Sequence, residues 1–155
     1  MAGKVEARLQ EKGITLPEVA APQGAYVPYI VSGKHVFLAG QLPMLDGQIQ
    51  VKGKLGQDVS LEDGQKAARI CGLNLIAQLK QACGGDLDRV SRVVKLTGFV
   101  NATPDYDAQP KVINGVSELM AEVFGDAGQH ARAAVGAGSL PLNVAVEVEG
   151  IFEIG

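Results

Sequence analysis

The end of the chain constrains the fold most, because its side chains alternate in a strand-like way. Between residues 144 and 154, one parity is apolar, at Val144, Val146, Val148, Phe152 and Ile154. The other parity carries Glu147, Glu149 and Glu153. Successive residues of a strand point to opposite faces, so this segment fits a sheet that is packed on one face only. The chain is therefore predicted to contain a sheet with one covered face and one polar face.

A single arginine, Arg132, precedes this strand within a run of small residues. The region 130–139 predicts another strand, and 140–143 predicts the connection to the last one. Two interpretations of the acidic parity stay open. The glutamates form a solvated outer face, as charged strand positions usually do. Alternatively, Arg132 binds an anion in a polar pocket beside a carboxylate, since a guanidinium matches carboxylate groups bidentately.

The remaining segments predict an α+β domain with helices between strands. Helices are expected at 4–12, after Ser60 and from Pro110 to Gly125, and strands at 26–31, 35–38, 48–51 and 90–101. Ser60 is a natural N-cap, and the glycines at 84–85 are a natural helix end. Two helices that connect strands are expected to cover one sheet face. We predict one domain over 1–155, in which 1–24 form an N-terminal helix and an extended segment.

Composition and charge argue against several classes of function. The 155 residues have a net charge of −3 and no cluster of Lys or Arg, so a nucleic-acid partner is not expected. No segment is apolar enough for a signal peptide or a membrane span, and a cytoplasmic protein is expected. Cys71 and Cys83 lie about 18 Å apart on one predicted helix, so both are expected to be free thiols. His35 and His130 lack companions at ligand spacing, so no metal site is predicted.

Two separated motifs resemble those of the Rid/YjgF family, also called L-PSP. The first is Arg132 with Val135, Leu140-Pro141 and the Val-Glu-Val sequence around Glu147. The second is the apolar segment 37–43, which ends as Gly40-Gln41-Leu42-Pro43. The resemblance runs from about Tyr26 to the C-terminus, so the first twenty or so residues look like an extension of a longer branch.

The resemblance implies a fold, an assembly and a site. The fold would be a chorismate-mutase-like mixed β-sheet with two helices on one face, and the assembly a homotrimer with ligand clefts between subunits. Arg132 would clamp a substrate carboxylate, and Glu147 would position a water. Tyr26, Gly40 and Gln41 would line the cleft, with the tyrosine contributed by the neighbouring subunit. No metal or organic cofactor is implied.

The implied reaction is hydrolysis of reactive enamine or imine intermediates, which are 2-imino acids derived from 2-aminoacrylate, to 2-oxo acids and ammonia. An alternative is a non-catalytic or regulatory trimer that binds 2-imino or 2-oxo carboxylates. A ribonuclease follows from the L-PSP label, but the acidic balance of the chain argues against it. Three positions depart from the family pattern. Val27 is followed by Pro28 where the family often has glutamine, Ala134 replaces a frequent cysteine, and Ser117 falls near an asparagine of some family members.

Overall fold

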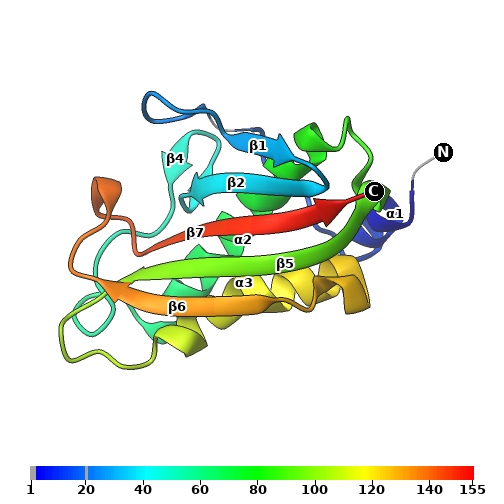
Figure 1. Cartoon of the computed structure of the whole chain (residues 1–155). Coiled ribbons are helices and arrows are strands. Elements are labelled where there is room, and N and C mark those ends of the chain that lie inside the picture. The colour runs from blue at the N-terminus through cyan, green and yellow to red at the C-terminus, as the bar shows by residue number, and fades with distance from the viewer. Residues whose placement is uncertain (1–2, 20) are drawn as a thin grey trace.

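The computed structural model describes residues 3–19 and 21–155, and its centre is a five-stranded mixed sheet (Figure 1). The strands follow the order β1-β2-β7-β5-β6. They are β1 (Tyr29–Ser32), β2 (His35–Gln41), β7 (Val146–Ile154), β5 (Val90–Asn101) and β6 (Ala131–Ala137). β5 and β6 are parallel, and the other neighbours are antiparallel. A second, two-stranded sheet pairs β3 (Met44–Leu45) with β4 (Gln48–Ile49).

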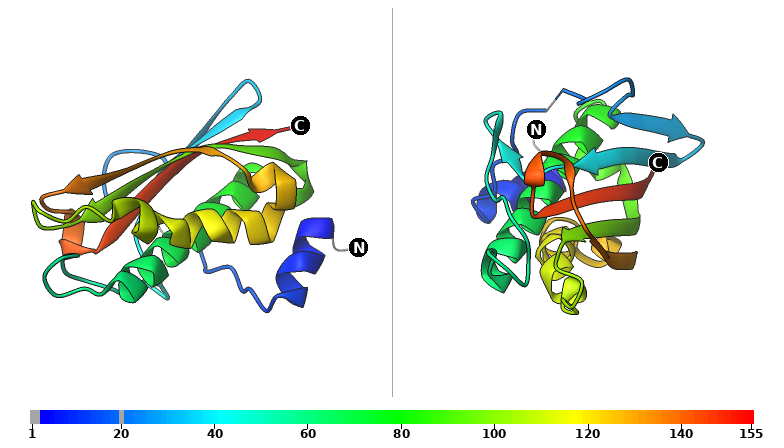
Figure 2. Two further views of the ribbon diagram at one scale, coloured as in Figure 1. Left: turned by 90° about the horizontal axis from the view of Figure 1, so that it is seen from below. Right: turned by 90° about the vertical axis from the view of Figure 1, so that its left-hand side faces the viewer.

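Two helices, α2 (Leu61–Ala82) and α3 (Gln109–Phe124), cover one face of the sheet (Figure 2). α2 begins as predicted, since Ser60 Oγ accepts a hydrogen bond from the Asp63 amide at 3.1 Å. The two helices approach closely at Gly72, where an added Cβ would lie 2.8 Å from side-chain carbons of Val116 and Leu119. The core lies between the helices and the sheet, and it includes the predicted parity of β7: Val146, Val148 and Phe152 are fully buried.

The predicted N-terminal helix is present as α1 (Lys4–Glu11), and it packs beside the end of α3. The carboxylate of Asp88, in the short 3-10 helix η1 (Leu87–Arg89), accepts hydrogen bonds from the amides of Lys4 and Val5, both at 2.9 Å. Arg8 Nη1 donates to the Val123 carbonyl at 2.8 Å. Together these contacts fix α1 at one end of the helix layer.

The strand boundaries differ from the predicted ones at proline and turn positions. β1 begins at Tyr29 instead of residue 26, because Pro28 has no N–H to donate to a ladder. β2 continues to Gln41 instead of ending at Leu38. β7 begins at Val146, after the short 3-10 turn η3 (Pro141–Asn143), in which Leu142 and Asn143 have a φ of 57°.

The face of the sheet away from the helices carries exposed apolar side chains. Phe37 on β2 is 44% exposed and Val135 on β6 is 43% exposed. Phe99 lies between them on β5, opposite both Val135 and Glu147. Exposed apolar groups that gather on one face are typical of a subunit interface. The trimer stays a prediction.

No helix within the described ranges has the length and apolar character that a membrane span requires.

Candidate functional site

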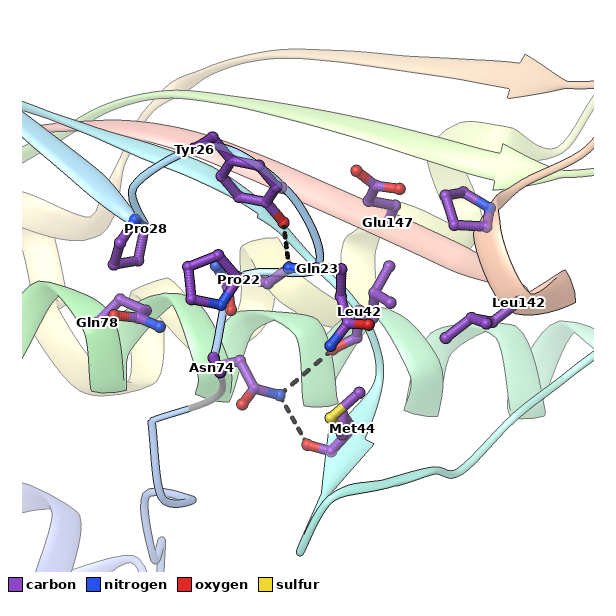
Figure 3. A pocket seen from close by; sticks show the side chains of 14 residues that line it. Pro22, Gln23, Tyr26, Pro28, Leu42, Met44, Asn74, Gln78, Leu142 and Glu147 are labelled. Carbon is purple, nitrogen blue, oxygen red and sulfur yellow. Dashed lines mark hydrogen bonds between the residues drawn. The ribbon is translucent and has the colours of Figure 1, made fainter.

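Glu147 projects from β7 into a pocket at the end of β2 (Figure 3). Its neighbours on the strand, Val146 and Val148, face the helices, so Glu147 points to the open face of the sheet. Gly40 makes this position possible, because a Cβ there would overlap Oε2 of Glu147 and lie 3.1 Å from its Cδ. The carboxylate therefore rests directly on the backbone of β2.

The surroundings of Glu147 change its acidity. Partial burial raises the pKa of the Glu147 carboxyl above its ordinary value, and the negative charge of Glu149 raises it further. A carboxylate with a raised pKa accepts a proton more readily near neutral pH than an exposed glutamate does. Glu147 is thus suited to act as a general base.

Three other predicted residues line the same pocket. Tyr26 stands across from Glu147, and its Oη accepts a hydrogen bond from the Gln23 amide at 3.1 Å. Gln41 is buried, and its Nε2 donates to the Ala39 carbonyl at 3.1 Å. Pro28, one of the departures from the family pattern, forms part of the wall, and its carbonyl accepts a bond from the Ala39 amide. Tyr26, Gly40, Gln41 and Glu147 therefore meet within one chain, whereas the resemblance implied that Tyr26 would reach the cleft from the neighbouring subunit.

The pocket is a cavity of about 280 Å³ that continues past the end of β2 to α2. The remaining lining residues are Ala21, Pro22, Gln23, Leu42, Met44, Asn74, Gln78, Pro141 and Leu142. Asn74 holds part of this wall in place, because its Nδ2 donates to the carbonyls of Met44 at 2.8 Å and Leu42 at 3.3 Å. Among the described lining residues, Glu147 is the one that carries a charge at neutral pH.

Arg132 lies elsewhere, on the helix side of β6. Its Nη1 donates to Asn114 Oδ1 at 2.8 Å and to Ser117 Oγ at 3.2 Å, and its Nη2 donates to the Pro110 carbonyl at 3.2 Å. These bonds use three of the five N–H donors of the guanidinium. Within residues 3–19 and 21–155, Arg132 forms no salt bridge. Nε and the second hydrogen of Nη2 take no part in these three bonds.

The Ser117 hydroxyl extends this arrangement to His130. His130 Nδ1 lies 2.6 Å from the Gly128 carbonyl, which can only accept, so Nδ1 carries the proton. In the neutral imidazole, Nε2 then accepts from Ser117 Oγ at 2.8 Å, while the same oxygen accepts from Arg132. Arg132 is thus held in one orientation by α3 and the start of β6.

One chain does not bring Arg132 and Glu147 together. Arg132 pairs with Leu96 of the core in the β5–β6 ladder, whereas Glu147 pairs with Phe99 of the open face. The two side chains therefore leave opposite faces of the sheet. The polar pocket that the sequence pattern suggested, with Arg132 beside a carboxylate of the last strand, does not form within a single subunit.

Comparisons with known proteins place the chain in a family. A family model described as "YjgF/chorismate mutase-like, putative endoribonuclease" matches residues 6–153. The protein TCP17 of Trypanosoma cruzi is 47% identical over 154 residues, which cover 99% of this chain and 96% of TCP17. The chain belongs to the YjgF family.

Solved structures share the fold of this chain over nearly its full length. Atu1372 of Agrobacterium tumefaciens, a protein with unknown function, is 48% identical with a TM-score of 0.91, covering 97% of this chain and 92% of its own. A Shewanella oneidensis protein described as a putative endoribonuclease is 39% identical with a TM-score of 0.94, covering 98% and 100%. The predicted α+β fold with a mixed, chorismate-mutase-like sheet is confirmed.

The sequence did not predict one contact of Arg132, the arginine of the YjgF motif. The resemblance places the family asparagine near Ser117, but the side chain at 2.8 Å from Arg132 is Asn114, one helical turn earlier on α3. Their i, i+3 spacing puts both residues on one helix face, which is the signal that could have identified the pair. Ala134, which replaces the frequent cysteine, packs against the core. Cys71 does not substitute for it, since burial raises the pKa of its thiol well above the ordinary value.

Proposed function

We propose that this YjgF-family protein hydrolyses 2-imino acids to 2-oxo acids and ammonia, in clefts shared by two subunits of a homotrimer. Each cleft would take the Glu147 pocket from one subunit and Arg132 from its neighbour. The observation that supports this proposal is that the Glu147 pocket and Arg132 each lack the charged group that the other supplies. The pocket holds a carboxylate and no cation, and Arg132 keeps two donors and has no acidic partner among the described residues.

The exposed apolar groups of the sheet support a contact between copies. Phe37 and Val135 lie on the open face, near opposite edges of the sheet. A head-to-tail contact repeated around a three-fold axis would cover both and would close into a ring. The same contact would bring the β6 edge of one subunit to the pocket side of the next.

The proposed hydrolysis uses two side chains, the Arg132 guanidinium and the Glu147 carboxylate. Arg132 holds the substrate carboxylate bidentately and so fixes the imine carbon. A water attacks this carbon, the C–O bond forms, and Glu147 accepts the proton that the water loses. Glu147 then returns this proton to the amino nitrogen of the tetrahedral adduct. Glu147 then carries the hydroxyl proton of the adduct to the same nitrogen as the carbonyl forms and the C–N bond breaks, so ammonia leaves with both protons of the water. When the substrate is 2-aminoacrylate, transfer of one proton from its amino nitrogen to C3 first gives the imine.

The test is ammonia release from 2-aminoacrylate that a serine dehydratase generates in the same reaction. The wild-type protein should accelerate release above the spontaneous rate, and Arg132→Ala should not, although it remains folded and assembled. Arg132→Lys should not restore the rate, because an ammonium cannot form the planar two-bond contact. A fully active Arg132→Ala variant would remove Arg132 from the mechanism.

The same purified protein also tests two alternative functions. Binding of pyruvate by calorimetry without any acceleration would favour a regulatory carboxylate-binding trimer. The endoribonuclease description of the family and of the Shewanella protein motivates an RNA-cleavage assay. We expect no cleavage, because the net charge is −3 and the pocket contributes one negative charge and no cation to hold phosphates.

A further inference from the structure

His130 lies directly before β6, two residues ahead of Arg132, and the proposed hydrolysis gives it no task. Its partly buried ring has a partner at each nitrogen: Nδ1 lies 2.6 Å from the Gly128 carbonyl, and Nε2 lies 2.8 Å from Ser117 Oγ. Ser117 Oγ in turn lies 3.2 Å from Nη1 of Arg132. Arg132, Ser117 and His130 therefore form one continuous chain of hydrogen bonds that ends on the backbone.

The direction of every bond in this chain is set by the groups at its two ends. The guanidinium of Arg132 can only donate, and the Gly128 carbonyl can only accept. Nδ1 must therefore carry the proton of the neutral ring, which leaves Nε2 to accept from the Ser117 hydroxyl. The other neutral tautomer would set the lone pair of Nδ1 against the Gly128 carbonyl at 2.6 Å. Bonds that all point one way polarise and strengthen one another.

The Gly128 end of the chain is fixed beside α3. Gly128 is buried in the short 3-10 helix η2 (Gly125–Gly128). A Cβ added at Gly128 would overlap the carbonyl oxygen of Met120, so backbone packs directly on backbone at this point. The carbonyl that binds the His130 ring is therefore held in place by the helix that also carries Ser117.

His130 keeps the Ser117 hydroxyl turned toward Arg132. A serine in the middle of a helix is ordinarily drawn to the carbonyl four residues earlier, which here is that of Ile113. The acceptor at Nε2 of His130 competes with this local bond and holds Oγ where Arg132 can reach it. Nη1 of Arg132 then has two acceptors, Ser117 Oγ and Asn114 Oδ1, which together fix the plane of the guanidinium.

We propose that His130 is a positioning residue for Arg132, acting through the Ser117 hydroxyl, so that the guanidinium presents the edge formed by Nε and Nη2 to a ligand carboxylate. This inference rests on the proposed function, in which that carboxylate belongs to the substrate. Without an acceptor at residue 130, Ser117 turns away and the guanidinium is free to rotate. A ligand must then arrest this rotation on binding, which weakens its affinity about fivefold.

Two substitutions at residue 130 test the acceptor itself. His130→Leu fills much of the space of the ring but accepts no hydrogen bond. His130→Gln keeps an acceptor, because its amide oxygen is as many bonds from Cα as Nε2 is. Gln129→Leu is the matched control, since Gln129 is the exposed neighbouring residue.

The enzymatic readout separates KM from kcat, with the imine generated in situ from alanine by an amino-acid oxidase in the presence of catalase. KM should rise about fivefold in His130→Leu with kcat nearly unchanged, because Glu147 and the water are not affected. His130→Gln and Gln129→Leu should keep the wild-type KM. In a protein that already carries Ser117→Ala, His130→Leu should raise KM no further, because the path to Arg132 is gone. Equal increases in both backgrounds would overturn the inference.

NMR of the isotope-labelled protein without ligand separates this inference from the reaction. Long-range proton–nitrogen spectra should place the proton of the His130 ring on Nδ1. Exchange between the two Nη nitrogens of Arg132 should become about fivefold faster in His130→Leu and not in His130→Gln. If the wild type hydrolyses no imine but these spectra are as expected, the deaminase proposal fails and the positioning of Arg132 by His130 stands. If the wild type is active but the proton lies on Nε2, or His130→Leu changes neither KM nor the exchange, the inference is overturned and the deaminase stands.

Discussion

A single methyl group at Gly40 should inactivate the protein without unfolding it. The Cβ of Gly40→Ala would overlap Oε2 of Glu147 and lie 3.1 Å from its Cδ, whereas ordinary contacts begin near 3.5 Å. Cδ must therefore retreat by about 0.4 Å, and Oε2, which is closer, by on the order of 1 Å. The obstacle is the end of a flexible side chain and not backbone, so the fold can accommodate the change.

Displacement of a catalytic group by this amount costs about 100-fold in rate, equivalent to about 2.7 kcal/mol in the activation barrier. The assay is kcat/KM for ammonia release, with the thermal midpoint and light scattering as checks on folding and assembly. Gly138→Ala is the control, since a Cβ there meets no atom within 4 Å, and it should retain wild-type kcat/KM. A Gly40→Ala protein that folds, assembles and keeps full activity would refute the role of the Gly40–Glu147 contact.

Three further predictions concern pH, ligand orientation and the fold. Because the pKa of Glu147 is raised, its charged form weakens the folded state, and stability falls as the pH rises through that pKa. Glu147→Gln should therefore raise the thermal midpoint at neutral pH while abolishing turnover. Glu149→Gln removes the negative charge that raises the pKa of Glu147, so it should move the acid limb of the pH–rate profile to lower pH. An acid limb that does not move would contradict this effect of Glu149 on Glu147. Ser117→Ala should raise KM far more than it lowers kcat, because it loosens Arg132, and Ser117→Thr should recover part of the loss. Ser60→Ala removes the α2 cap and should lower the thermal midpoint by about 2–4 °C with kcat/KM unchanged, as measured by calorimetry.

The elements with strong local signals were predictable from the sequence. The α2 helix was located by its cap at Ser60 and by its glycine end, and the alternation of β7 correctly separated its buried parity from its glutamates. β5 was placed at its observed bounds, Val90–Asn101, because its β-branched run contains no proline and a single glycine, Gly98, does not interrupt it. In each case neighbouring residues contain the information that the fold uses.

The composition of the site was harder to predict, because its parts come together only in three dimensions. β6 consists almost entirely of alanine, glycine and valine, so no alternation revealed that Arg132 faces the helices. Residues 21–23 have no periodicity, and only the docking of α1 and the path to β1 bring them over the cavity. Asn74 lies within the apolar pattern of α2. Nothing in that pattern predicts that its side chain bonds to the β3 segment.

The claim that one site is built from two subunits is tested most directly by combining two inactive variants. Arg132→Ala and Glu147→Gln would be co-expressed with different affinity tags, and trimers carrying both tags would be isolated. Any such mixed trimer contains one cleft in which an intact Glu147 meets an intact Arg132, so activity should return to about one third of the wild-type value. Mixed trimers as inactive as either parent, beside a fully active doubly tagged wild type, would show that the two residues do not share a cleft between subunits.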